Sequence, residues 1–163
     1  MLKGEAILLR PFGEVDLGRI HILFSGSLEK AREFLDKAMR RQDYIDHFAI
    51  EIDGIWSGFA VLEASSQYTD RFFLKLDIQD ERNRTFENLC EATKMLLNHY
   101  FGFFPGRRIG ADVFENDQLL LSVYDSCGFK RECRVRERKW LDGEYRDLIK
   151  FGILRREWEE AKT

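Results

Sequence analysis

The sequence predicts an α+β fold in which helices flank a mostly antiparallel sheet that contains one parallel strand pair. Two observations predict the antiparallel part: Asp53-Gly54 and Asp142-Gly143 each separate two apolar runs, as the tight turn of a β-hairpin does. A third is the strand, helix, strand order between residues 72 and 113, because a strand that follows a crossover helix pairs in parallel with the strand before it.

Composition places the chain among ordinary globular proteins. Its 163 residues are 44% hydrophobic and 34% charged, without a linker or repeat, which predicts one domain over residues 1–163. A net charge of -3 gives no reason to expect nucleic acid or an anionic membrane as a partner. Without an apolar run of membrane-spanning length or a basic and apolar leader, we expect a cytoplasmic protein.

The N-terminal third predicts a strand and two helices. Residues 6–11 form an apolar run stopped by Pro11, which is typical of a strand near a sheet edge. A short helix is expected from Glu14 to Phe24. Ser27 is placed to cap a second helix that continues to about Gln42, with apolar residues at helical spacing.

The middle of the chain predicts an antiparallel meander of three strands, and the rest adds the parallel step and a closing hairpin. The meander strands are expected over Phe48–Ile52, Trp56–Glu63 and Phe72–Ile78, with a polar loop from Ser65 to Arg71 before the third. The later elements are a long helix (Thr85–Phe101), a strand (Arg108–Val113), a short helix (Asp117–Ser126) and two hairpin strands (Glu132–Leu141 and Tyr145–Leu154).

The junction between the third meander strand and the long helix, Asp77 to Glu91, is the first candidate site. A helix N-terminus leaves unpaired N–H groups that point at one spot, where many folds hold a phosphate. The competing interpretation is a structural turn that is capped by its own side chains. The junction alone does not decide between them.

The C-terminal third carries motifs that resemble a known family. They read Tyr124-Asp125-Ser126-Cys127-Gly128-Phe129-Lys130, then Arg136, then Asp142-Gly143-Glu144-Tyr145-Arg146-Asp147, and finally Leu154-Arg155-Arg156-Glu157-Trp158. This succession resembles the GNAT superfamily of N-acetyltransferases, in the branch of the ribosomal-protein N-terminal acetyltransferases (RimJ/RimL-like). Leu8-Leu9-Arg10-Pro11 with Asp16-Leu17 resembles the opening of the same branch.

The resemblance implies a GNAT fold and transfer of an acetyl group from acetyl-CoA to a primary amine, on a small molecule or a protein N-terminus. Tyr124 matches the acid that protonates the departing thiolate. A backbone N–H near Asp77 or Ile78 would stabilise the oxyanion. For the base, Asp77 is preferred over Glu51, since it lies on the strand beside the expected thioester.

The family's cofactor loop, Q/R-x-x-G-x-G/A, falls on Arg84 to Leu89, where both glycines are replaced. Glu87 can satisfy the N–H groups that an anion would use, and it would repel a pyrophosphate, which Arg82 and Arg84 would partly offset. The expected cofactor-binding residues are Ile78, Arg82, Arg84, Thr85, Phe86, Glu87, Asn88, Leu89, Asn116 and Asp117.

Other activities have weaker support in the sequence. The lost glycines favour an alternative, in which a catalytically inactive GNAT-fold protein serves as a binding or interaction module. His21, His47 and His99 lack the spacing of metal ligands, so no metal site is expected. The three cysteines, Cys90, Cys127 and Cys133, contain no C-x-x-C pair and predict reduced, buried thiols, with Cys127 a weak candidate nucleophile. The sequence does not decide whether the protein forms a homodimer.

Overall fold

The computed structural model of the chain describes residues 1–40, 45–65 and 68–162. Its sheet has the order β1-β2-β3-β4-β5-β6-β8-β7, and among the described strands only β5 and β6 pair in parallel. The predicted α+β class with one parallel step is therefore confirmed. The strands are β1 (Leu2–Lys3), β2 (Ile7–Arg10), β3 (Ile45–Ile52), β4 (Ile55–Ser65), β5 (Tyr68–Ile78), β6 (Arg108–Phe114), β7 (Lys130–Leu141) and β8 (Glu144–Leu154).

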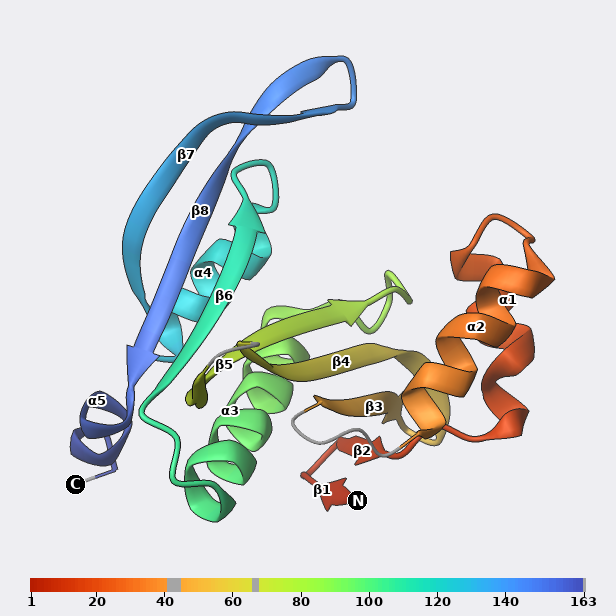
Figure 1. Ribbon diagram of the computed structural model, residues 1–163, viewed down its shortest axis with the longest axis horizontal. Coiled ribbons are helices and arrows are strands. Elements are labelled where there is room, and N and C mark those ends of the chain that lie inside the picture. Colours follow the sequence, from red (N-terminus) through yellow and green to blue (C-terminus); the bar gives the residue numbers. More distant parts are fainter. Residues whose placement is uncertain (41–44, 66–67, 163) are drawn as a thin grey trace.

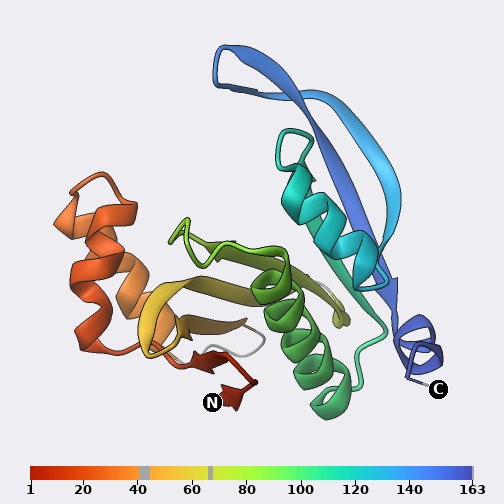
Figure 2. The ribbon, with the colours of Figure 1, turned by 180° about the vertical axis from the view of Figure 1, so that it is seen from behind.

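The helices lie on both faces of this sheet. They are the 3₁₀ turn η1 (Glu14–Asp16), α1 (Leu17–Leu23), α2 (Leu28–Met39), α3 (Phe86–Phe103), α4 (Gln118–Ser126) and α5 (Arg155–Glu160). Figures 1 and 2 show α3 and α4 together on one face, with α1 and α2 beside β3 and β4. Successive side chains of β4 point to opposite faces of the sheet. Ala60 and Leu62 belong to the core under α3, whereas Phe59 belongs to the cluster that includes Leu35 of α2.

The N-terminal segment differs from its prediction in detail. A two-residue strand, β1, pairs outside β2, so β2 lies one strand in from the edge. The helix expected over residues 14–24 is divided into η1 and α1. Ser27 caps α2 as predicted, because its Oγ accepts the Lys30 N–H at 3.4 Å; the expected end near Gln42 lies outside the described residues.

The meander and both hairpins form where the Asp-Gly dipeptides predict them. Asp53 and Gly54 have φ angles of 51° and 76°, and Asp142 and Gly143 have 51° and 85°, the left-handed pairs of type I′ turns. However, β5 begins at Tyr68, so residues 68–71 extend the strand instead of the predicted polar loop. The strand is long because it pairs with β4 back to Ser65.

The sheet divides where its single parallel pair ends. β5 and β6 pair from Arg71 opposite Arg108 to Leu74 opposite Ala111. Beyond these pairs the two strands continue to Ile78 and Phe114, but they no longer pair with each other. Figure 1 shows the two halves diverging from this point, with the β7–β8 hairpin leaning over the gap. The divergence exposes one edge of each strand at the centre of the molecule.

Two further expectations concern the surface and the cysteines. Among the described residues, no helix combines the length and apolar character that a membrane crossing needs.

Cys90 is buried and Cys127 partly buried, but Cys133 is exposed, so the expectation of buried thiols is wrong for Cys133. The reason is that β7 is an edge strand with almost no buried side chains.

Candidate active site

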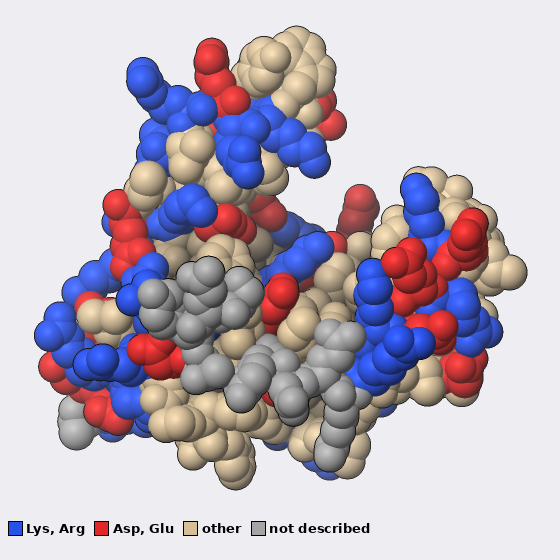
Figure 3. Space-filling view, viewed as in Figure 1, with Lys and Arg blue, Asp and Glu red and all other residues tan. Residues whose placement is uncertain are grey.

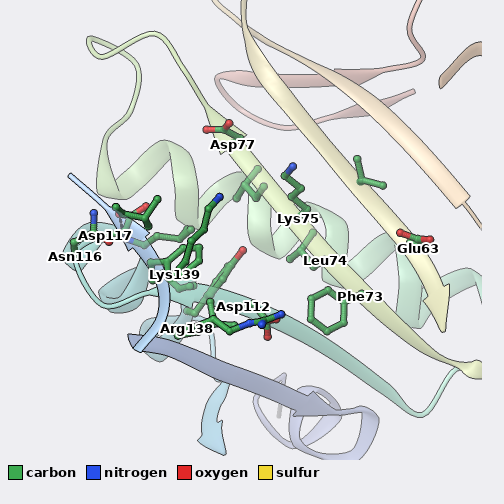
Figure 4. Close-up of a pocket in the computed structure, with 18 of the residues that line it drawn as sticks. Glu63, Phe73, Leu74, Lys75, Asp77, Asp112, Asn116, Asp117, Arg138 and Lys139 are labelled. Atoms are coloured by element: carbon green, nitrogen blue, oxygen red, sulfur yellow. Dashed lines mark hydrogen bonds between the residues drawn. The ribbon is translucent and has the colours of Figure 1, made fainter. Parts of the chain in front are cut away.

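A cavity of about 980 Å³ lies where β5 and β6 diverge. Residues of β5 and β6 form its walls, the start of α4 closes one end, and side chains from β7 lie over it (Figure 4). Figure 3 shows the hollowed face between the β7–β8 hairpin and the α1–α2 pair, with Lys and Arg side chains crowded on the hairpin. None of Phe86, Glu87 and Leu89 lines the cavity, so these bulkier loop residues leave it open.

Tyr124 lines this cavity from α4. Only 1% of the residue is exposed, and its ring packs against Phe129 and Phe151 at centroid distances of 5.0 and 5.6 Å. Burial raises the pKa of the phenol above its ordinary value of 10, so the hydroxyl stays protonated at neutral pH. A protonated phenol held rigidly beside a cavity can act as a general acid.

Asp77 lines the same cavity from the end of β5. Its side chain is partly exposed and accepts a hydrogen bond from Gln79 Nε2 at 3.1 Å, and no cation pairs with it in the described part of the chain. The other base candidate, Glu51, lies outside the cavity lining and is bound by Arg10 Nε at 2.6 Å. Asp77 is therefore the candidate base that the fold places beside the open space.

The end of β5 is held in place by β4. Gly58 stands opposite Ile78, and a Cβ at residue 58 would overlap the carbonyl oxygen of Asp77, so glycine permits this close approach. The buried Ser57 of β4 also binds the end of β5, because its carbonyl oxygen accepts the Gln79 N–H at 2.8 Å. The opposite edge of β5 has no strand partner beyond Leu74, so backbone N–H groups on that edge face the gap.

The junction between β5 and α3 is held by side-chain hydrogen bonds next to the positions where the family has glycines. Thr85 Oγ1 accepts the Asn88 N–H at 3.2 Å, and Asn88 Nδ2 donates to the Asn83 carbonyl at 2.9 Å. Asn83 in turn donates to Ser57 Oγ at 3.1 Å. Thr85, and not Glu87 as the sequence suggested, is thus the residue that caps α3, and the exposed Glu87 contributes only its charge to the first turn.

Both arginines that were expected to face a pyrophosphate are already engaged. Arg84 Nη2 lies 2.5 Å from Asp117 Oδ2, and Arg82 Nε lies 3.3 Å from Asp80 Oδ1. Asp117 also caps α4, because its Oδ1 accepts the Leu120 N–H at 3.1 Å. The Arg84–Asp117 pair consequently links the beginning of α3 to the beginning of α4 at one end of the cavity.

The structure brings together four of the residues singled out in the sequence. Asp77, Asn116, Asp117 and Tyr124 line the cavity. The other expected cofactor residues do not line it and lie at the junction or in the core: Ile78, Arg82, Arg84, Thr85, Phe86, Glu87, Asn88 and Leu89.

Sequence reasoning missed several charged residues of the cavity. Lys75, Asp112, Arg138 and Lys139 all line it. The first two could have been found from strand periodicity, since Lys75 lies two residues before Asp77 and shares its face. Arg138 and Lys139 carry no such signal, because an irregularity in β7 determines their direction.

The cysteine and histidine alternatives are not supported by the geometry. The Cys127 thiol donates to the Cys90 carbonyl at 3.9 Å, and burial raises its pKa to about 12, so almost none of it is thiolate at neutral pH. His47 lines the cavity, and burial lowers its pKa. Within the described ranges, no three His, Cys, Asp or Glu side chains form a group that could hold a metal ion.

A mixed sheet whose one parallel pair splits over a cavity, with a helix N-terminus at the split and a tyrosine from the next helix, is the GNAT fold of the N-acetyltransferases. No family model matches the chain. In sequence it is 25% identical over 139 residues to the "Putative ribosomal N-acetyltransferase YdaF" of Bacillus subtilis, which covers 83% of this chain and 75% of that protein.

Solved structures show the same fold. The spermidine N-acetyltransferase of Vibrio cholerae, in complex with CoA and spermine, has a TM-score of 0.82 and 19% identity, over 96% of this chain and 99% of its own. RimL, a ribosomal L7/L12 α-N-protein acetyltransferase in complex with CoA, has a TM-score of 0.81 and 16% identity, over 93% and 95%. The predicted resemblance to GNAT N-acetyltransferases is thereby confirmed.

Proposed function

We propose that the protein is an N-acetyltransferase that transfers the acetyl group of acetyl-CoA to a primary amine. The observation that carries this proposal is the open cavity between the diverging β5 and β6, into which the buried, protonated Tyr124 and the unpaired carboxylate of Asp77 both face. A thioester in this gap would lie against the free edge of β5, with the acid on one side and the base on the other.

Each residue supplies a separate part of the reaction. Asp77 accepts the proton of the ammonium, directly or through water, and the neutral amine attacks the thioester carbonyl. A backbone N–H at the free end of β5, near Asp77 or Ile78, stabilises the oxyanion. As the carbon–sulfur bond breaks, Tyr124 donates its proton to the departing thiolate. The nitrogen loses its second proton to water, which returns a proton to the phenolate, and Asp77 releases the first proton to solvent.

The cofactor end of the site is the beginning of α3. The N–H groups of Phe86 and Glu87 in the first helical turn have no intrahelical partner, and the helix dipole favours an anion there. Glu87 opposes that anion, and Arg84 is held by Asp117. These two features favour the second candidate, a GNAT-fold binding module without turnover.

The relatives support an amine as acceptor without specifying it. One is named for ribosomal N-acetylation, another for L7/L12 α-N-protein acetylation and a third for spermidine. A small amine and a protein N-terminus are therefore the two acceptor classes that we propose.

Thermal unfolding and acetyl transfer together test the proposal. Acetyl-CoA at 100 times its dissociation constant should stabilise the native state by about 2.7 kcal/mol, because it binds only the folded protein. Release of free CoA on addition of amines should then report turnover. Stabilisation without turnover on any amine would favour the binding module, and neither effect at millimolar acetyl-CoA would refute the acetyltransferase proposal and favour a module that does not bind the cofactor.

A further inference from the structure

The β7 strand contains an irregularity directly above the cavity. Val135 pairs with Leu148 and Lys139 pairs with Arg146, so three residues of β7, 136 to 138, stand opposite Asp147 alone. Glu137 in the middle has a φ of 48°, which is uncommon outside glycine and asparagine. Such bulges change the direction of the side chains that follow them.

Asp147 holds this bulge in place. Its Oδ1 accepts the Glu137 N–H at 2.9 Å, and its Oδ2 accepts from Arg134 Nη1 at 2.6 Å. Glu115 completes the network, since it lies 3.3 Å from the same Arg134 nitrogen and accepts the Asp147 N–H at 3.1 Å. The bulge is therefore stabilised by specific interactions from β8 and from the loop after β6.

The bulge places two cations in the cavity. Arg138 and Lys139 both line it, and Figure 4 shows both side chains extending from β7 into the open space. Neither forms a salt bridge with a carboxylate of the described residues. Two acidic neighbours are neutralised elsewhere, because Asp112 pairs with Lys150 at 3.3 Å and Asp117 pairs with Arg84.

The wall formed by β4 and β5 carries two carboxylates without a cationic partner among the described residues, with a lysine between them. Asp77 and Glu63 face the cavity from β5 and β4, and no cation of the described residues pairs with either. Lys75, between them on the same face, lies over the Phe59 ring at 5.3 Å. The cavity thus carries two carboxylates and Lys75 along β4 and β5 and, within the described part of the chain, two further unpaired cations on β7.

From this distribution of charge we infer that the acceptor carries its own anionic group, a carboxylate or phosphate near the primary amine, which Arg138 and Lys139 bind while the ammonium faces Asp77. The acceptor is then either a small amino acid-like molecule or an acidic protein N-terminus. A polycationic amine is disfavoured, because its distal ammonium would meet Arg138 and Lys139. This inference rests on the proposed acetyltransferase function.

Matched acceptors test it. We expect the wild type to acetylate aspartate over its diamide, or a C-terminally amidated Ser-Asp-Glu-Ala peptide over amidated Ser-Asn-Gln-Ala, by at least about tenfold in kcat/KM. Spermidine should be poorer than either acceptor that lacks the anionic groups. Whichever of the two pairs shows the preference identifies the source of the anionic group. Equal rates within each pair, or a preference for spermidine, would overturn the inference and leave the acetyltransferase proposal intact.

Variants of Arg138 and Lys139 test whether these two side chains cause the preference for acidic acceptors. R138Q/K139Q should lower kcat/KM for the acidic acceptor by roughly tenfold to a hundredfold through KM, while the KM for acetyl-CoA and the rate with the uncharged analogue stay within about threefold. R136Q is the matched control, since Arg136 belongs to the same bulge but does not line the cavity. A raised KM for acetyl-CoA in the double variant would instead assign the two cations to the cofactor's phosphates and overturn the inference.

A binding measurement separates this inference from the proposed function. Calorimetric titration of the acetylated acidic peptide, with CoA present, should give an affinity that R138Q/K139Q reduces at least about tenfold and that 0.5 M salt also weakens. If no amine is acetylated but this binding behaves as described, the anion site stands and the catalytic proposal fails. If neither acidic probe binds more tightly than its uncharged analogue, the inference is wrong.

Discussion

At the scale of single residues, Tyr124 shows how position determines chemistry. The same phenol on a solvent-exposed helix face would titrate near pH 10, whereas here burial raises its pKa. The hydroxyl therefore remains a proton donor over the whole physiological range. Asp77, the proposed base, is partly exposed and has no cationic partner among the described residues, so the proposed acid and base occupy very different environments within one cavity.

Replacing Tyr124 with Phe is expected to lower kcat by about a hundredfold to ten-thousandfold, because the thiolate then leaves without a proton donor. The ring contacts with Phe129 and Phe151 are retained, so melting temperature and acetyl-CoA affinity should be nearly unchanged. Steady-state kinetics and thermal shifts measure the two effects. Undiminished turnover would remove Tyr124 from the mechanism.

Asp117→Asn is expected to tighten acetyl-CoA binding. An amide oxygen can still cap α4 at Leu120, but the charge that holds Arg84 is lost, so the guanidinium becomes available to a phosphate. We expect the dissociation constant to fall about threefold to tenfold, by analogy with other charge-assisted hydrogen bonds. The double variant D117N/R84Q should lose this gain; if it does not, Arg84 has no part in the cofactor site.

At the scale of elements, the beginning of α3 determines how well an anion can bind. Thr85, Asn83 and Asn88 supply the hydrogen bonds that shape the turn, so the turn persists although both glycines of the family's loop are replaced. The dipole and the first N–H groups are properties of any helix. What differs in this chain is the charge that Glu87 adds at that point.

Glu87→Gln and Glu87→Gly separate charge from geometry at this turn. The Glu87 carboxylate has the same sign of charge as the cofactor's pyrophosphate. Removing it should improve the free energy of binding by about 0.3–1 kcal/mol, so both variants should bind acetyl-CoA roughly twofold to fivefold more tightly. Both variants should lose about 0.3–1 kcal/mol of folding stability because the carboxylate no longer interacts with the helix dipole, and the glycine variant should lose roughly 1 kcal/mol more. Calorimetry and denaturant unfolding measure the two. Weaker binding by Glu87→Gln would show that the carboxylate takes part in cofactor binding.

At the scale of the whole molecule, a buried ion pair joins the N-terminal helices to the sheet. Arg10 of β2 binds Asp16 at 2.7 Å and Glu51 of β3 at 2.6 Å, and Asp16 is only 2% exposed. Burial raises the pKa of Asp16, but the hydrogen bonds from Arg10 and from the Gly13 N–H outweigh it, so the pKa lies below its ordinary value. The pair thus stabilises the native state while Asp16 is ionised.

Asp16→Asn is expected to destabilise the protein by about 2–4 kcal/mol at pH 7, because it leaves Arg10 without its buried partner. Since the folded pKa is lowered, this stability is present above the unfolded pKa of about 3.9 and is lost as pH falls through the folded value. The difference between wild type and variant should therefore shrink below about pH 4. Glu14→Gln, in the exposed pair with Arg32, should cost under about 1 kcal/mol.

The order and type of the elements were determined by local sequence. Asp53-Gly54 and Asp142-Gly143 specify left-handed turns, Ser27 and Thr85 specify helix starts, and apolar periodicity specifies which face each element buries. These signals act over a few residues, which is why they can be read without coordinates. The resemblance around Tyr124 pointed to the residue that the structure places at the cavity.

Only the tertiary structure decided which residues share the site. Arg84 binds Asp117, which lies 33 positions later in the sequence, and Glu51 pairs with Arg10 and does not line the cavity. The bulge of β7 directs Arg138 and Lys139 inward because Asp147, on the neighbouring strand, binds its backbone. Such pairings depend on strand order and register, which are set by packing of the whole sheet and not by the residues beside them in sequence.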